Sequence, residues 1–145
     1  MRRARLLSLV VLMLVPAAAW PQGNPVGPEF RVNTFTIGYQ QLPDVAADAA
    51  GNFVVAWASY QDGSTYGIFG QRYDSAGTPL GLEFRVNTFT TNGQTRPAVA
   101  AEPLGNFVVT WDSQLQEGPP PAGLGVFGQR YGPILPVELM HYGVE

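Results

Sequence analysis

Short stretches of alternating apolar and polar residues fill the chain after residue 20, and none keeps the 3.6-residue period of a helix. Within 29–34, for example, Phe30, Val32 and Thr34 share one face and polar residues occupy the other, as in a half-buried strand. Turns rich in Gly, Asn, Asp and Pro separate the stretches. The first half of the chain is therefore predicted to contain four strands, Glu29–Thr34, Val45–Asp48, Phe53–Ser59 and Ile68–Tyr73.

The second half of the chain repeats the first. At a constant offset of 54 residues, 20 of the 31 positions that align 29–59 with 83–113 are identical. Three strings carry the duplication: EFRVNTFT at 29–36 and 83–90, GNFVVxWxS at 51–59 and 105–113, and FGQRY at 69–73 and 127–131. Such self-similarity is typical of stacked or propeller-like architectures. We predict repeat 1 over 29–82 and repeat 2 over 83–137, after a linker over 20–28.

The last residues contain a degenerate third copy of the start of the repeat. The two FGQRY strings are 58 residues apart, and at that offset Tyr142 aligns with Phe84 and Val144 with Val86. We therefore predict that 138–145 forms an edge strand on the sheet of repeat 2, as 84–88 does on the sheet of repeat 1.

The first 19 residues are typical of a secretory signal peptide. Three arginines precede the apolar run Leu6–Val15, and small residues follow it. This run is short for a transmembrane helix, which needs about 20 apolar residues. We expect cleavage after Ala19, a secreted protein in the extracellular space or the periplasm, and helix only within the signal peptide.

The amino-acid composition limits the classes of molecule that the protein could bind. All eight basic residues are Arg, and without the leader five of them remain against eleven acidic residues, a formal charge of −6. A chain this acidic does not assemble the basic patch that nucleic acid requires. It also has no Cys, which excludes disulfides and thiolate metal sites. We expect no nucleic acid and no membrane span after cleavage, and instead a protein or glycan partner, with homo-oligomers as a further option.

The repeated strings as a set, PxVA, GNFVVxWxS, GxFGQRY and EFRVNT, support a family resemblance. They resemble a tandem repeat of large secreted and surface proteins of bacteria, including calcium-binding, haemolysin-type exoproteins. The resemblance implies repeats like four-stranded propeller blades, hence an all-β fold of two tandem antiparallel sheets plus the C-terminal strand. Closed propellers typically need four to eight blades. With two repeats, we expect an incomplete propeller-like or a sandwich-like arrangement.

Large aromatic residues recur at equivalent positions in the two repeats. Trp57 and Trp111 occupy the central strand of each repeat, and we interpret them as core anchors. Four phenylalanines have the same predicted role: Phe53, Phe107, Phe69 and Phe127. The alternative is that the Trp rings stack on sugars, as in small propeller lectins. Gly70 and Gly128 give a large ring room to lie across the neighbouring strand.

The loop 59–66 supplies the candidate ligand-facing aromatics, Tyr60 and Tyr66. This loop resembles the Asp-box of sialidase-type propellers, but its Asp62 is one position late and Tyr66 stands where Trp is usual. The box stabilises a turn in those proteins and carries no catalysis. We therefore interpret the loop as a turn.

Catalytic chemistry has few candidates. His141 is the only histidine, and it lies among the last five residues. Asp44 and Asp48 are the nearest acidic pair, but four residues along a strand would separate them by about 13 Å. The paired carboxylates of glycosidases lie only about 5–9.5 Å apart. We expect a protein that is not an enzyme.

Metal binding has weak support. Calcium takes 6–8 oxygen ligands, usually with several carboxylates converging. The acidic residues of the loops are instead scattered singly along the chain, at Asp62, Asp74 and Glu117. We expect no cofactor, with a weak Ca²⁺ site as the alternative.

Several polar residues are identical in both repeats: Arg31 and Arg85, Gln71 and Gln129, Arg72 and Arg130. They would form either two equivalent ligand subsites or cross-strand pairs worth about 0.2–1 kcal/mol each. We favour the pairs. The sequence thus indicates a non-catalytic β-repeat protein, acting as a binding or structural module at the bacterial cell envelope or outside the cell. The alternative is a small carbohydrate-binding lectin in which two-blade chains assemble into a propeller.

Overall fold

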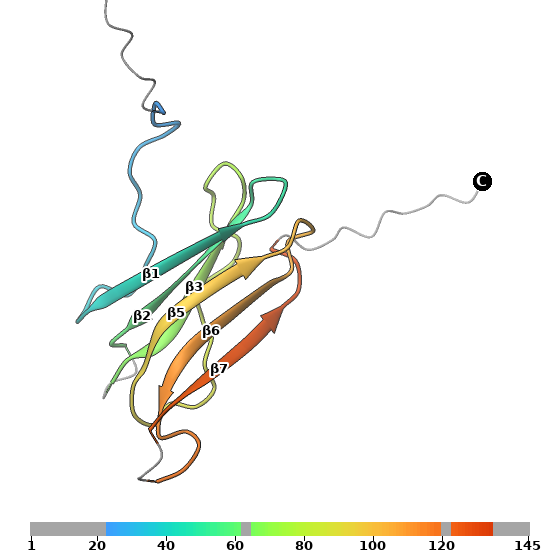
Figure 1. Ribbon diagram of the computed structural model, residues 1–145. Helices are drawn as coiled ribbons and strands as arrows, with labels where there is room; N and C mark the ends of the chain where they lie inside the picture. Colours follow the sequence, from blue (N-terminus) through green and yellow to red (C-terminus); the bar gives the residue numbers. More distant parts are fainter. Residues whose placement is uncertain (1–22, 62–64, 120–122, 135–145) are drawn as a thin grey trace, which may run out of the picture. The chain divides into compact units, whose positions relative to one another are not determined.

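A computed structural model describes residues 23–61, 65–119 and 123–134 (Figure 1). Within these residues there are seven strands and no helix, so the predicted all-β class is confirmed. The strands are β1 Gln40–Ala47, β2 Phe53–Ser59, β3 Gly67–Tyr73, β4 Phe84–Arg85, β5 Gln94–Ala101, β6 Phe107–Gln114 and β7 Leu124–Tyr131. They form two open antiparallel sheets, ordered β1-β2-β3-β4 and β5-β6-β7.

The strands before each central strand are longer than predicted, because each passes through a proline at a bulge. β1 begins at Gln40 rather than Val45, and its pairing with β2 shifts register between Gln41 and Asp44. Pro43 lies inside that shift, where its missing N–H removes no ladder hydrogen bond. The same irregularity occurs in β5 around Pro97, and the residue before each proline has a positive φ, 55° at Leu42 and 53° at Arg96.

The predicted strand Glu29–Thr34 is not formed, since residues 23–39 contain no strand. The equivalent residues of repeat 2 do form one: in β4, Arg85 pairs with Phe69 and Phe84 with Gly70. This pairing confirms, for Phe84 and Arg85, the prediction that 84–88 adds to the sheet of repeat 1. The EFRVNTFT segment therefore completes the sheet of the repeat before it, and sheet and sequence repeat are out of phase.

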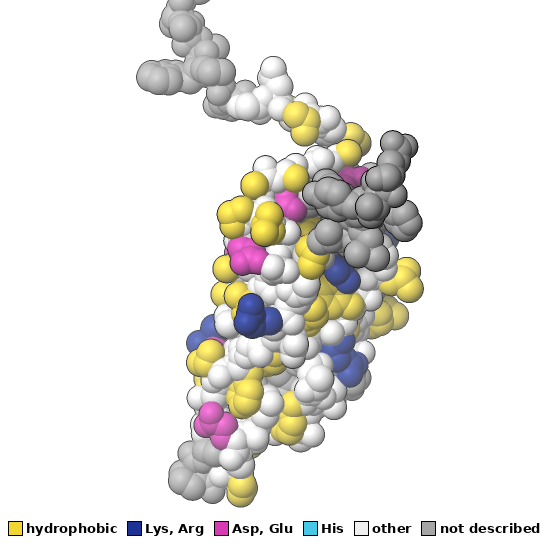
Figure 2. Space-filling view, turned by 90° about the vertical axis from the view of Figure 1, so that its right-hand side faces the viewer, with side chains coloured by type: hydrophobic (Ala, Val, Ile, Leu, Met, Phe, Trp, Pro, Cys, Tyr) yellow, Lys and Arg dark blue, Asp and Glu magenta, His cyan; other side chains and the backbone are white. Residues whose placement is uncertain are grey.

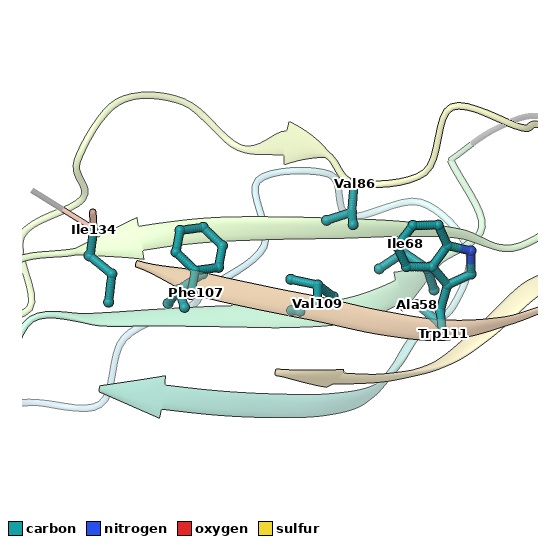
Figure 3. Packing of buried hydrophobic residues seen from close by; sticks show 9 residues of the cluster. Ala58, Ile68, Val86, Phe107, Val109, Trp111 and Ile134 are labelled. Atoms are coloured by element: carbon teal, nitrogen blue, oxygen red, sulfur yellow. The ribbon is translucent and has the colours of Figure 1, made fainter. Parts of the chain in front are cut away.

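The two sheets pack face to face through different faces of equivalent strands. Val54, Ala56 and Ala58 of β2 meet Phe107, Val109 and Trp111 of β6 in one hydrophobic core. Figure 3 shows this packing, with Ile68 of β3 beside Trp111 at one end and Ile134 beside Phe107 at the other. Phe107 is the equivalent of Phe53, not of Val54, so the contact is head-to-tail rather than symmetric. The sandwich-like arrangement follows from this contact.

Hydrogen bonds donated by backbone N–H groups also join the two sheets. Val99 N donates to Asp44 Oδ2 at 2.7 Å, and Ala49 N donates to Pro103 O at 3.2 Å. At the other end of the sheets, Gln94 N donates to Tyr66 O at 2.8 Å. Such ties fix the relative position of the sheets as well as their separation.

A second, smaller hydrophobic cluster lies on the other face of the first sheet. It contains four buried residues, Val55, Trp57, Phe69 and Tyr73, with Val32 and Phe53 packed against them. The Tyr73 hydroxyl donates to Val32 O at 3.2 Å, which fixes the incoming chain on this face. Val32 thus covers the first sheet in the way that its equivalent, Val86, enters the core between the sheets.

Two other sequence predictions fall outside the described residues. The signal peptide over 1–19 and the edge strand over 138–145 both stay predictions. Residues 23–30, at the end of the predicted linker and the start of repeat 1, are exposed and contain no strand. No helix in the described part of the chain has the length and hydrophobicity needed to span a membrane.

Candidate binding surfaces

Tyr60 and Tyr66, the predicted ligand-facing aromatics, lie in contact with each other. Their rings meet edge to face, with centroids 5.5 Å apart and planes at 74°. Tyr66 is half-buried against the core between the sheets, whereas Tyr60 has 41% of its surface exposed. Of the two, Tyr60 is therefore the ring that a ligand could reach. Asp62 of the same loop lies outside the described residues.

The predicted anchor residues lie in the interior or pack against it. Trp57 and Trp111 are both buried, so neither indole offers a face to a sugar in this structure. Phe53 stacks on Tyr73 at 4.8 Å and Phe107 stacks on Tyr131 at 4.7 Å, each with 12° between the rings. Phe69 is buried and Phe127 is half-buried. Burial raises the pKa of the Tyr73 and Tyr131 hydroxyls above the usual value.

The acidic residues considered for catalysis hold the fold together instead. Asp44 accepts the hydrogen bond that ties the two sheets. The Asp48 carboxylate accepts bonds from Ala50 N and Asn52 N, both at 2.9 Å, and from Asn52 Nδ2 at 2.8 Å. Its pKa is lowered, chiefly by the Asn52 side chain, because these donors stabilise the charged form. Each carboxylate is thus occupied by its own turn or by the facing sheet.

Asp74 has the same turn-forming role at the next corner. It accepts hydrogen bonds from Ala76 N at 2.9 Å and Thr78 N at 2.8 Å. The bond from the Thr78 backbone is the largest cause of a lowered pKa for this carboxyl. Among the described residues, no three acidic or histidine side chains gather where they could hold a metal ion.

The repeated arginines of the first sheet pack on aromatic rings. The Arg72 guanidinium lies 5.5 Å from the centre of the Phe84 ring, and that of Arg85 lies 5.6 Å from the centre of the Phe69 ring. Both contacts join β3 to β4. Arg130, the equivalent of Arg72, is exposed on β7. In Figure 2, which views the molecule from the side where β7 lies in Figure 1, arginines and apolar side chains are interspersed.

Two hollows lie on the outward faces of the two sheets. One, of about 470 Å³, is bordered by 31–34 and 79–83, with Gln71 and Tyr73 at its base. Beside it, the Glu83 carboxylate accepts bonds from Thr34 N and Thr34 Oγ1, both at 2.8 Å. The other, of about 260 Å³, lies over β5, β6 and Arg130. Both are shallow and mixed in polarity, so neither is specific for one ligand class.

Sequence reasoning missed an ion pair on the outward face of the second sheet. Arg96 Nη1 lies 3.0 Å from Asp112 Oδ2. The equivalent residues of repeat 1, Leu42 and Ala58, are uncharged. Ala58 faces the core between the sheets, whereas Asp112 lies on the outward face of the second sheet, so the two charged residues occur together on that outward face. A comparison of the positions at which the two repeats differ, and not only of those that are identical, would have indicated this pair.

Comparisons of this chain with family models, with curated proteins and with solved structures found no match. The described surfaces must therefore be interpreted from their own chemistry.

Proposed function

We propose that this is a secreted, non-catalytic β-repeat protein that acts as a binding or structural module at the cell envelope or outside the cell. One observation supports this most: the carboxylates Asp44, Asp48 and Asp74 all accept backbone hydrogen bonds that hold turns or sheets. A catalytic carboxylate must instead face a substrate. These three carboxylates thus stabilise the fold, and we infer that the protein acts through the binding of a partner to its surface.

The N-terminal segment supports the proposed location. Its basic residues, short apolar run and small residues are those of an export signal. Expression of the full-length gene in a bacterial host, followed by mass spectrometry of the medium and periplasm, tests this directly. We expect a chain that begins near Trp20. A protein that keeps its first residues and stays in the cytosol would contradict the proposal.

A glycan is the second candidate partner, on the strength of the exposed Tyr60 ring beside Tyr66. Aromatic faces suit the apolar faces of sugars because contact removes both apolar surfaces from water. The experiment is a glycan-array screen of the exported protein, with Tyr60→Ala as the variant. Leu104, which is 83% exposed and lies in the turn between β5 and β6, provides the control Leu104→Ala. Binding lost only in the first variant supports a lectin; no binding, or equal loss in both, removes this candidate.

A further inference from the structure

Strands β3 and β7 contain the same FGQRY string, but only β3 has its outer edge covered. There β4 adds as an antiparallel strand, with Phe84 opposite Gly70 and Arg85 opposite Phe69. Two more bonds extend the pairing: Val86 N donates to Ile68 O at 2.7 Å, and Ile68 N donates to Asn87 Oδ1 at 2.6 Å. The edge of β3 is therefore bonded along four residues of the EFRVNTFT segment.

Side chains make this pairing specific for the segment. A methyl group on Gly70 would come within 3.0 Å of the Phe84 ring, so only glycine lets that ring lie across the strand. The Arg72 guanidinium lies over the same ring, and Arg85 lies over Phe69. Phe84 also meets Tyr131 of the second sheet edge to face, with centroids 5.4 Å apart. The receiving edge thus needs a glycine and an arginine in the FGQRY spacing.

The edge of β7 has these groups, and no described strand pairs with it. Gly128 and Arg130 are exposed, and a methyl group on Gly128 would touch only Thr110 and Val109 among the described residues. Val126 is 74% exposed, although its equivalent Ile68 is fully buried. Among the described residues this edge has no strand beside it, and sheet edges of this kind recruit a further strand.

The complementary segment is present once more in the chain. Residues 29–36 are identical to 83–90, precede the first sheet and form no strand. Phe30, the equivalent of Phe84, has half of its surface exposed. One chain therefore carries a donor segment that precedes its first sheet in sequence, and a matching acceptor edge on β7 of its second sheet.

We propose that residues 29–32 of one copy add as a strand to the β7 edge of a second copy. The β3–β4 register places Phe30 opposite Gly128 and Arg31 opposite Phe127. Val32, which lies on the first sheet of the donor, is then held between the sheets of two copies, as Val86 is held within one. The contact is head-to-tail, so it builds a ring or a filament rather than a symmetric dimer.

The strand, rather than the sheet face, holds the copies together. Thr110 and Asp112 replace Ala56 and Ala58 on the outward face of the second sheet, which leaves less apolar area to bury there. Because the contact buries little apolar area, we expect it to be weak and reversible. The fraction of associated protein should then rise with protein concentration. This inference rests on the strand contacts and does not depend on the proposed function.

Solution mass is the first test. The protein, purified after normal export from cells that express the full-length gene, is measured by analytical ultracentrifugation over a wide concentration range. We expect a mass that rises above the monomer with concentration, and a loss of this rise in Phe30→Asp. The control Val26→Asp changes a fully exposed residue outside the donor segment and should associate as the wild type does. A monomer at every concentration, or association unchanged in Phe30→Asp, overturns the proposal.

Disulfide formation provides a second test that does not alter the donor ring. The protein has no Cys, and the proposed register places Glu29 opposite Gln129, both exposed. Mixing the single variants Glu29→Cys and Gln129→Cys under mild oxidation should give a crosslinked pair of chains at several-fold higher yield than mixing Val26→Cys with Gln129→Cys. Equal yields contradict the register. A full-length monomer that associates only after deletion of 138–145 places the chain's own tail on β7, and also overturns the proposal.

Discussion

Strands β3 and β7 share five consecutive residues, and they have opposite surroundings. All but one of the seven residues of β3 are buried, whereas only Gly125 is buried among the eight of β7. The difference lies in the neighbours: β3 is covered on its edge by β4 and on one face by the second sheet. In a repeat protein the burial of a strand depends on the unit that packs against it. Identical sequences can therefore be buried in one repeat and exposed in the other.

The outward face of the second sheet shows how the same repeat ends at a surface. The equivalents of Leu42 and Ala58 are Arg96 and Asp112, which form an ion pair there. Exposed pairs contribute only about 0–1 kcal/mol, so the pair adds little stability. Its effect is to make the outward face of the second sheet more polar than the equivalent face of the first sheet.

The two tryptophans give the largest expected effect. Trp111 lies in the core between the sheets, whereas Trp57 belongs to the smaller cluster under Val32. Replacement of a buried Trp by Ala costs about 3–5 kcal/mol, and we expect Trp111→Ala to lie at the upper end of this range. Denaturant unfolding of both variants measures the free energies of unfolding. Equal losses, or a larger loss in Trp57→Ala, would show that the core between the sheets is not the dominant one.

The two glycines of the FGQRY strings compare the covered and open edges directly. A methyl group at Gly70 would meet the Phe84 ring at 3.0 Å and Val55 O at 3.3 Å, so Gly70→Ala should cost about 1–3 kcal/mol through overpacking. Gly128→Ala meets only Thr110 Cγ2 closely, at 3.3 Å, and should cost less than half as much. Thermal melting distinguishes them. A larger loss in Gly128→Ala would place an unrecognised neighbour on β7.

The arginines two residues later should differ by a smaller amount. Arg72 lies over the Phe84 ring at 5.5 Å, a contact worth about 0.5–1 kcal/mol at an exposed site. Arg72→Gln should therefore lower the melting temperature slightly, and Arg130→Gln should leave a monomeric sample unchanged. Equal shifts in dilute samples would show that the ring contact contributes nothing. At high concentration, Arg130→Gln should weaken the proposed association.

The smallest expected effect concerns the charge of Asp48, which can be tested through the pH dependence of stability. The lowered pKa of Asp48 means that its stabilisation is present above the ordinary value of 3.8 and is lost as pH falls through the folded pKa. The stability difference between wild type and Asp48→Asn should thus be constant near neutral pH and vanish in strong acid. Unfolding curves measured between pH 7 and about pH 2 test this, since the range spans ordinary carboxyl titration. A difference that persists in strong acid would assign the effect to the amide rather than to the charge.

Local alternation predicted much of the fold. The faces of β2, with Phe53, Val55 and Trp57 together, and the pairing of β2 with β3 agree with the pattern of the sequence. The repeat also predicted that 84–88 adds to the sheet of repeat 1, and β4 confirms this for Phe84 and Arg85. The pattern did not predict that the identical segment at 29–34 forms no strand, because strand formation there depends on a neighbouring edge that is distant in sequence. The tie from Asp44 was hidden for a related reason: its equivalent in repeat 2 is Ala98, so the repeat gave no signal for it.

The phase shift between repeat and sheet also orders the folding of the chain in time. The first sheet lacks its β4 strand until Phe84 and Arg85 have been made, so repeat 1 cannot finish folding before repeat 2 has begun. During synthesis from the N-terminus, the sheet of each repeat would keep one unpaired edge until the first residues of the next repeat have been made. Lengthening the array by further duplications would move this waiting edge along the chain without removing it.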